Sequence, residues 1–367
     1  MKVKVLQFIT GLNPGGAEMM MYKTIEQLNH KKYEIVICSL VGGSLEKEIS
    51  KKYKVIVLNA QSVFSLPAAI LKLRKIIKKE KIDIIHSYLY HANIVSRIAA
   101  MGTKAKVISS IRIKEIKKKS HNIIDALTSG LVDKYTVVAR NVREFIIKKE
   151  GISPERIITI PNGLDFKKYE VKVDKKKKLK ELGLKKDSKI LISVANLRKT
   201  KDYPTLFKAV KLVLNHYPVE LLVVGKGEAE EEYKKIAEQL GIMKHVHFLG
   251  FRKDEVKIEL VKISDICILS TFYEGQSNSL LEYMAMEKPI VATAIEENIE
   301  VIDDGKEGLL TKPKSPELME KAIIKLLEDK MLREKLARNA YNRVKKYHDI
   351  KRVAKQTEKL YEELCAE

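Results

Sequence analysis

The sequence lacks the features that mark membrane and secreted proteins. None of its apolar runs approaches the roughly 20 residues that a membrane-spanning helix needs. Residues 1–9 predict a first strand, and they are too short and too interrupted by lysine to form a secretory signal. The three cysteines, Cys38, Cys267 and Cys365, lie far apart, so we expect free thiols in a reducing compartment rather than a disulfide framework. These absences favour a cytoplasmic protein.

Metal-binding motifs are also missing. No cluster of Cys and His has the spacing of a zinc site. No Asp-x-Asp motif follows a predicted strand, and Asp303-Asp304 precedes Gly305, which is typical of a turn. We therefore expect neither a metal nor a bound cofactor.

Acidic residues are scarce in one half of the chain. Residues 1–165 contain 29 Lys and Arg against 14 Asp and Glu, and residues 166–189 contain 11 against 4. Residues 190–367 contain 30 of each, so the whole net charge of +22 lies before them. A basic first half indicates an acidic partner for that half.

Two segments concentrate this positive charge. Residues 71–79 combine helical apolar spacing with a basic face, and residues 111–119 add a second basic cluster. Such helices can lie on anionic lipid at the cytosolic face of a membrane. A solvated, lysine-rich surface explains the same pattern, and both interpretations stay open. Nucleic acid is disfavoured, because no aromatic residues are interleaved and no binding module is evident.

Short apolar runs rich in β-branched residues alternate with helical patterns throughout the chain. This alternation predicts an α/β protein with two doubly wound parallel sheets. The expected strands are 3–9, 34–40, 55–58, 82–86, 107–110 and 135–139, then 190–195, 219–224, 246–249, 266–269 and 289–293. The expected helices are 17–28, 66–80, 92–101 and 142–150, then 203–216, 230–240, 280–286 and 316–327. Residues 167–186 predict a surface connection, and residues 329–367 predict an amphipathic helical end.

Two glutamates flank one strand-to-helix turn in the second half. Glu274 follows the apolar run 266–270, and Glu282 lies in the first turns of the apolar helix that comes next. Between them Ser277, Asn278 and Ser279, followed by Leu280, occupy the helix start, where unpaired N–H groups and the helix dipole favour an anion. One anion site between two hydroxyl acceptors suits a sugar nucleotide.

Glu274 and Glu282 form an E-x7-E pattern, and with it the chain resembles the retaining GT-B glycosyltransferases of family 4. Five further motifs occur in the order found in that family. They are Gly15-Gly16-Ala17-Glu18, Ile160-Pro161-Asn162-Gly163, Asn196-Leu197-Arg198 with Lys201, Val224-Gly225-Lys226-Gly227-Glu228 and Phe248-Leu249-Gly250.

The resemblance implies two Rossmann-like domains that face a central cleft. Residues 1–166 would bind the acceptor, and residues 187–340 would bind the nucleotide sugar. Residues 341–367 would form a helix that crosses back to the first domain; a helix that packs only on the second domain is the alternative.

The resemblance also assigns roles in the second domain. Lys201 and Arg198 lie on a βα loop, where positive groups stabilise a departing diphosphate without a metal; Asn196 stands where many relatives have the Arg. Glu282 would bind ribose hydroxyls and Glu274 the transferred sugar. Ser277 to Leu280 would meet the phosphates and sugar. Walls around ribose and base are expected from three further residues, Gly225, Gly227 and Arg252, the last stacking on the base.

Two positions in the first domain are candidates as well. Gly15 and Gly16 would let the backbone approach a phosphate or the donor sugar, although a structural turn would use them too. His91 follows a predicted strand, where relatives place a His that contacts the donor sugar. The family's His-x-His reads His86-Ser87-Tyr88 here, so His91 and Tyr88 remain alternatives for this role, with His86 as a strand-end residue.

The function implied is a retaining, metal-independent transferase of the EC 2.4 class. Its donor would be a nucleotide-diphosphate sugar, most often a UDP-sugar, and its acceptor a glycan or lipid-linked sugar in the synthesis of cell-surface polysaccharide, lipopolysaccharide or glycolipid. Front-face attack would let the leaving phosphate help to deprotonate the acceptor hydroxyl. The alternatives are a GT-B nucleotide-sugar epimerase or phosphorylase, and a non-catalytic nucleotide-sugar-binding protein.

Overall fold

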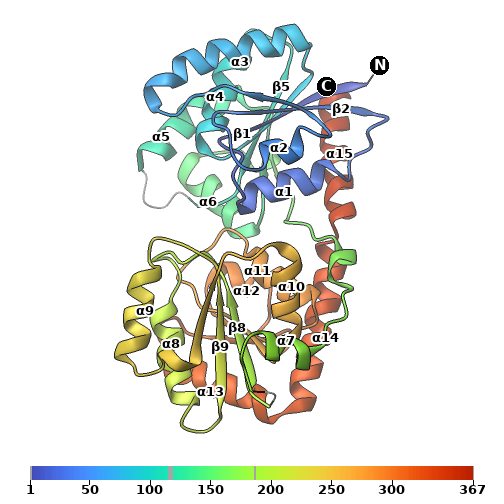
Figure 1. The fold of residues 1–367 in the computed structure, drawn as a ribbon. Helices are drawn as coiled ribbons and strands as arrows, with labels where there is room; N and C mark the ends of the chain where they lie inside the picture. The colour runs from blue at the N-terminus through green and yellow to red at the C-terminus, as the bar shows by residue number, and fades with distance from the viewer. Residues whose placement is uncertain (1, 115–118, 186, 367) are drawn as a thin grey trace. The chain divides into compact units, whose positions relative to one another are not determined.

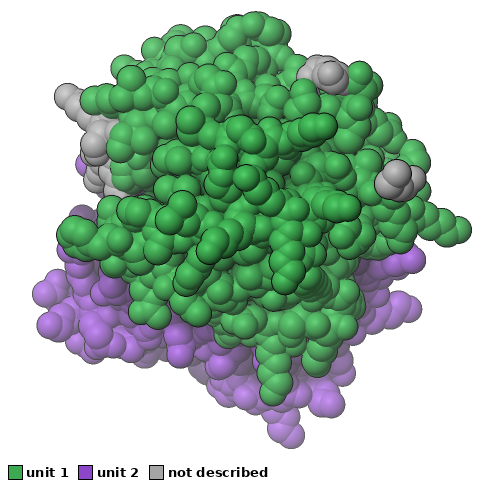
Figure 2. Space-filling model, turned by 90° about the horizontal axis from the view of Figure 1, so that it is seen from above, with its two compact units in different colours: residues 1–163, 350–367 green, residues 164–349 purple. Residues whose placement is uncertain are grey.

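Two parallel β-sheets, each covered by helices, divide the chain into two α/β units. A computed structural model describes residues 2–114, 119–185 and 187–366. Unit 1 comprises Met1–Gly163 with Ile350–Glu367, and unit 2 comprises Leu164–Asp349; Figure 2 colours the two units separately. Each contains one parallel sheet, which confirms the predicted doubly wound α/β class.

Unit 1 is built on a seven-stranded parallel sheet of order β3-β2-β1-β4-β5-β6-β7. Because the order reverses between β1 and β4, the edge beyond their carboxyl ends is the topological switch point where such sheets bind ligands. The strands are β1 (Val3–Ile9), β2 (Tyr33–Ser39), β3 (Lys54–Val57), β4 (Ile84–Tyr88), β5 (Lys106–Ile111), β6 (Lys134–Val137) and β7 (Ile157–Thr159).

Helices cover both faces of this sheet (Figure 1). One apolar core packs α3, α4 and α6 on one face, and a second packs α1, α2 and α15 on the other. The C-terminal helix α15 thus contributes Val353, Leu360 and Tyr361 to the core of unit 1. The helices are α1 (Gly16–Ile25), α2 (Glu46–Ile49), α3 (Leu66–Glu80), α4 (Tyr90–Ala100), α5 (Lys119–Thr128), α6 (Arg140–Glu150) and α15 (Ile350–Ala366).

Unit 2 repeats the plan with a six-stranded parallel sheet of order β10-β9-β8-β11-β12-β13, so its switch point lies between β8 and β11. Its strands are β8 (Lys189–Val194), β9 (Val219–Val224), β10 (Val246–Gly250), β11 (Ile266–Leu269), β12 (Ile290–Thr293) and β13 (Leu309–Thr311).

The helices of unit 2 also form two layers. One face of the sheet packs on α7, α10, α11 and α14, and the other on α8, α9 and α13. These helices, with the short α12, are α7 (Lys175–Glu181), α8 (Tyr203–Val213), α9 (Glu230–Gln239), α10 (Asp254–Ile263), α11 (Asn278–Ala285), α12 (Glu296–Ile299), α13 (Pro316–Glu328) and α14 (Lys330–Tyr347).

Residues 167–186 were predicted to form a surface connection between the two domains, and the structure corrects this. This segment belongs to unit 2, forms α7, and buries Tyr169 and Leu179 in the core. Three partly buried side chains, Val173, Leu182 and Leu184, pack against the same core and help to anchor the segment. The division at residues 163 and 164 therefore replaces the expected boundaries at 166 and 187.

The predicted helical end is two helices rather than one. Helix α14 belongs to unit 2 and α15 to unit 1. They are separated at His348, whose carbonyl accepts a hydrogen bond from the Leu164 N–H at 2.7 Å. Strands β7 and β13 and helices α2, α5 and α10 were not expected from the sequence.

In the described part of the chain, no helix combines the length and the apolar character that crossing a membrane would require.

Candidate functional site

Two loops of unit 2 meet at the switch point between β8 and β11. In the loop after β11, the Phe272 N–H and the Thr271 hydroxyl donate hydrogen bonds to the Thr200 carbonyl, at 3.0 and 3.1 Å. Lys201 and Thr271 form an isolated antiparallel bridge. These backbone contacts hold the segment that carries Lys201 against the segment that leads to Glu274.

Lys201 and Glu274 form a direct ion pair at this junction. The Lys201 ammonium contacts the Glu274 carboxylate, and the side chains are only 12% and 16% exposed. The Tyr233 hydroxyl lies 2.8 Å from both the Lys201 and Arg198 carbonyls and fixes the loop from the side of α9. A cation and an acceptor are thus held side by side at the predicted catalytic position.

The Arg198 side chain behaves differently. It is exposed, and so are those of Asn196 and Lys199, which flank it. Lys199 pairs at 3.4 Å with Glu232 on α9. Of the two predicted cations, only Lys201 is therefore held in a defined position next to Glu274.

Glu282 lies on α11 and is 7% exposed. Its two carboxylate oxygens accept hydrogen bonds from the Lys257 ammonium on α10 at 2.9 and 2.8 Å, and Lys257 also pairs with Asp254 at 3.0 Å. Burial lowers the pKa of Lys257, but the charges of Glu282 and Asp254 and their hydrogen bonds outweigh this effect and raise it overall. Lys257 therefore stays charged and places a cation directly against the Glu282 carboxylate.

The N-terminus of α11 lies between the two glutamates. Ser277 is the N-cap, and its buried hydroxyl accepts the Leu280 N–H at 3.4 Å. Asn278 and Ser279 form the first turn, are half-buried, and precede the buried Leu280. The first-turn N–H groups and the helix dipole make this end favourable for an anion.

Gly225 and Gly227 serve close packing of the loops. Gly225 has φ of +148°, and a Cβ at either position would collide with backbone, at the Ala195 carbonyl and the Leu197 carbonyl respectively. The Leu197 N–H donates to the Lys226 carbonyl at 3.0 Å, which ties the two loops together. The glycines thus support the loop that carries Lys201. Arg252, by contrast, has an exposed side chain beyond β10.

Gly15 and Gly16 begin helix α1 in unit 1. Gly15 is the N-cap and has no side-chain cap. A Cβ at Gly15 would meet the Glu18 carboxylate, so that carboxylate folds back against the helix start. Burial raises the pKa of Glu18, while its backbone hydrogen bond and the charge of Arg112 act in the opposite direction. The chain thus places its own acid at this helix end.

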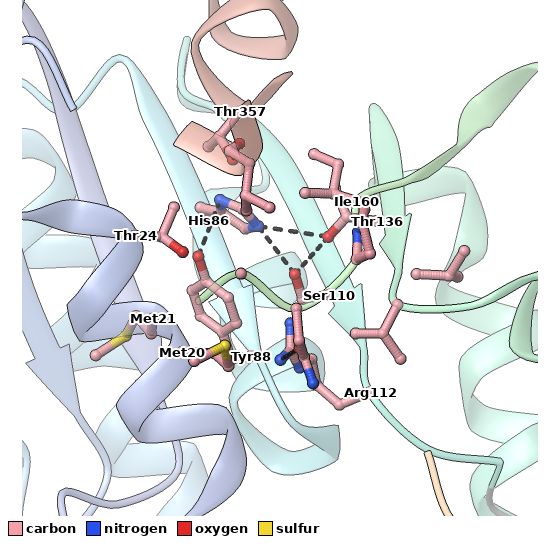
Figure 3. Close-up of a pocket in the computed structure, with 16 residues that line it drawn as sticks. Met20, Met21, Thr24, His86, Tyr88, Ser110, Arg112, Thr136, Ile160 and Thr357 are labelled. Carbon is pink, nitrogen blue, oxygen red and sulfur yellow. Dashed lines mark hydrogen bonds between the residues drawn. The ribbon is translucent and has the colours of Figure 1, made fainter. Parts of the chain in front are cut away.

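His86 and Tyr88 belong to a buried polar network on β4 (Figure 3). Gln7 donates to the Tyr361 hydroxyl at 2.8 Å, and that hydroxyl lies 2.8 Å from His86 Nδ1. Tyr88 donates to Gln7 Oε1 at 2.9 Å. If Tyr361 donates to Nδ1, then Nε2–H is free to donate to Ser110 Oγ at 2.9 Å. Burial, reinforced by the nearby Arg112 charge, lowers the pKa of His86 to about 3.

His91 lies outside that network, in the first turn of α4. Its ring packs edge-on against Tyr90 and His121, with centroids 5.3 and 6.0 Å away. It lines a cavity of about 220 Å³, whereas the Tyr88 hydroxyl is already engaged with Gln7. Tyr88 lines the other cavity, drawn in Figure 3, so both alternatives for the family's second histidine lie at a cavity of unit 1.

Sequence reasoning missed Lys257 and the network partners Gln7 and Tyr361. Lys257 is one of many lysines, on a helix that was not predicted, and Gln7 and Tyr361 are separated by 354 residues. No local signal identifies them. Across residues 2–114, 119–185 and 187–366, no three His, Cys, Asp or Glu side chains are grouped to hold a metal ion.

Comparison with known proteins identifies relatives of both units. Residues 174–343 match the family described as Glycosyl transferases group 1, and residues 14–168 match Glycosyltransferase Family 4. An uncharacterized glycosyltransferase of Methanocaldococcus jannaschii is 34% identical over 68% of this chain and 64% of its own length.

Two further proteins are similar over nearly the whole chain. The UDP-Gal:alpha-D-GlcNAc-diphosphoundecaprenol alpha-1,3-galactosyltransferase of Escherichia coli is 24% identical over 93% of this chain and 92% of its own. Anabaena HepE, crystallised with UDP, superposes with a TM-score of 0.87 at 20% identity, over 99% of this chain and all of that one. The architecture is therefore the GT-B fold, and the chain belongs to the family 4 glycosyltransferases.

Proposed function

We propose that the protein transfers a sugar from a nucleotide-diphosphate sugar, with retention of anomeric configuration and without a metal, to a glycan or lipid-linked acceptor. The observation that carries the proposal is the ion pair between Lys201 and Glu274 beside the N-terminus of α11. In a nucleotide sugar the β-phosphate and the anomeric carbon share one oxygen. Groups that bind the two must therefore be adjacent, as this pair is.

The roles follow from charge. Lys201 and the first-turn N–H groups of α11 stabilise the negative charge that develops on the leaving diphosphate. Glu274 accepts hydroxyls of the transferred sugar and stabilises positive charge at its anomeric carbon. Glu282, held in place by Lys257, accepts the ribose hydroxyls. Arg198 is the second cation of this proposal, and the departing phosphate takes the proton of the acceptor hydroxyl.

Relatives support the choice of donor and pathway. The Escherichia coli relative is named for UDP-Gal and a diphosphoundecaprenol-linked acceptor, and Anabaena HepE was crystallised with UDP and with UDP-glucose. A UDP-sugar donor and a role in cell-surface polysaccharide synthesis are accordingly the proposed assignment.

Titration calorimetry with UDP, GDP and ADP, followed by mass spectrometry of donor hydrolysis with and without EDTA, tests the donor. UDP should bind, and EDTA should leave hydrolysis unchanged. Glu282→Ala should weaken UDP binding at least tenfold, while Glu255→Ala on the exposed side of α10 should not. Wild-type binding in Glu282→Ala would contradict the site, and NMR of the product anomer tests retention.

The same proposal includes contact with an anionic membrane through α3. This helix exposes several lysines together with Leu71, and the turn before it exposes Val63 and Phe64, the last by 96%. The second predicted basic cluster, residues 111–119, lies only partly within the described residues, because residues 115–118 are outside them. Wild-type protein should sediment with phosphatidylglycerol vesicles and Phe64→Ser should do so less; equal sedimentation with phosphatidylcholine vesicles would contradict the contact.

A further inference from the structure

A second cavity lies in unit 1, beyond the carboxyl ends of β4 and β5. Its volume is about 220 Å³, far above the ~10–15 Å³ that a single water needs. It is lined by residues from the loop after β1, the start of α4 and the segment after β5, and it shares Ser110 and Arg112 with the cavity of Figure 3. A cavity of this size has room for a small organic ligand.

Arg112 is a cation with few partners at this cavity. Among the described residues its guanidinium makes one hydrogen bond, to the Asn162 side-chain oxygen, although it carries five N–H donors. The neighbouring acid is Glu18, which acts on it through space without an ion pair within the described residues. Burial lowers the pKa of Arg112 to about 10, which still leaves it charged at neutral pH.

Two oxygens at the same cavity also lack partners among the described residues. Asn93 is 4% exposed, and its Nδ2 donates to the Ser110 carbonyl at 3.1 Å, which fixes the amide with Oδ1 as the remaining acceptor. Neither Asn93 Oδ1 nor Thr10 Oγ1 has a hydrogen-bond partner. Buried polar atoms without partners are costly, so a ligand that supplies hydrogen-bonding groups to these two oxygens would be stabilised here.

We propose that this cavity binds the acceptor, and that the acceptor is a hydroxylated molecule with an anionic group, a phosphate or a carboxylate. The anion lies on Arg112, and ligand hydroxyls meet Asn93 and Thr10. This inference rests on the proposed transferase function. Two acids, Asp125 and Glu150, also line the cavity, and Asp125 forms an ion pair with Arg97 at 2.7 Å. A neutral acceptor would leave the Arg112 donors unsatisfied.

Ligand-observed NMR on the full chain tests this inference with three probes: glucose, glucuronic acid and glucose 1-phosphate. Each probe is titrated without and with saturating UDP, and the probes are compared with UDP present, so that a probe phosphate cannot report on the diphosphate site of unit 2. At least one anionic probe should bind tenfold or more tightly than glucose. Equal binding of all three probes, or loss of anionic binding when UDP is added, overturns the inference.

Variants identify the residue responsible. Arg112→Gln keeps a donor for Asn162 but removes the charge, and it should abolish the tenfold preference, whereas Arg112→Lys should retain part of it. Thr10→Val should weaken both kinds of probe about equally. Arg140→Gln, an exposed arginine on α6, is the matched control and should keep the full preference. Thermal melts establish that each variant is folded; a folded Arg112→Gln that keeps the preference overturns the assignment.

This outcome is separable from that of the donor proposal. UDP binding and donor hydrolysis by the wild type test the nucleotide-sugar function without reference to the cavity. If none of UDP, GDP and ADP binds, the transferase proposal fails; if UDP binds but the anionic preference is absent, only the acceptor inference fails.

Discussion

The two units place different chemistry at equivalent positions of the same sheet topology. At the β8–β11 switch point of unit 2, charged pairs meet: Lys201 with Glu274, and Lys257 with Glu282. At the β1–β4 switch point of unit 1, neutral groups bond one another, with His86 and Tyr361 at the centre. Fixed charge can stabilise a reaction in which charge develops, whereas a saturated neutral network contributes mainly rigidity. Catalysis should therefore depend on unit 2, and stability on the network in unit 1.

The largest effect is expected when the ion pair between Lys201 and Glu274 in unit 2 is removed. Lys201→Ala removes the cation beside Glu274 and should lower the transfer rate by about 100- to 1,000-fold, the usual cost of one stabilising group in a transition state. Lys199→Ala, two positions away and exposed, should change the rate less than twofold. Steady-state rates with a UDP-sugar donor measure both, and equal losses would show that position in the loop does not matter.

The next largest effect is expected when Glu282 loses its ion-pair partner Lys257. Lys257→Met leaves a nearly buried carboxylate uncompensated and should lower the free energy of unfolding by about 2–3 kcal/mol. The same change should weaken UDP binding, because the carboxylate is no longer held. Lys257→Arg keeps the charge and should lose less than half as much. Chemical denaturation and calorimetry of the three proteins give the comparison.

A smaller loss is expected in the neutral network. Tyr361→Phe removes the hydroxyl that accepts from Gln7 and lies 2.8 Å from His86, and should cost about 1–2 kcal/mol of unfolding free energy. UDP affinity should stay within twofold of the wild type, since the residue belongs to unit 1. Tyr347→Phe, at an exposed tyrosine of α14, is the control and should change neither quantity. A large loss of UDP affinity in Tyr361→Phe would remove the functional distinction between the units.

The last expected effect is a change of slope rather than of level, a pH dependence that originates in His86. Its pKa is about 3 in the folded protein against 6.5 ordinarily, so between these values the unfolded chain binds more protons. Stability should therefore fall as pH drops from about 6.5 toward 3, by at most about 1.4 kcal/mol per pH unit from this group. Urea midpoints between pH 5 and 7 should show a shallower slope in His86→Gln than in the wild type. His216→Gln, at an exposed histidine, should leave the slope unchanged.

Local patterns predicted the two sheets and their order of elements, because each buried strand is a continuous β-branched run and each long helix has a 3.6-residue apolar period. The elements that were missed are short or ambiguous. Strands β7 and β13 have three residues each, and α10 begins in a charged segment that reads as a loop. The anchoring of residues 167–186 depends on the buried Tyr169 and Leu179 and the partly buried Val173, Leu182 and Leu184, whose spacing follows no helical or strand period.

The candidate site likewise contains residues that the sequence predicts and residues that it does not. Glu274, Glu282 and the Ser277 cap are adjacent in the chain, so one strand-to-helix turn predicts them together. Lys257 comes from a different helix, and no spacing in the chain links it to Glu282. The packing role of Gly225 and Gly227 was equally hidden, because the carbonyls that exclude a Cβ come from the loop after β8.

By itself the amino-acid sequence determined the fold class, the basic first half and the loop positions of the candidate catalytic groups, since each depends on residues near one another in the chain. Only the tertiary structure decided which cation meets which carboxylate, which histidine is buried in a network, and that Arg112 makes one hydrogen bond among the described residues. Those outcomes depend on distances between strands and helices that are far apart in the sequence. Electrostatic interactions and desolvation depend on such distances, whatever the separation along the chain.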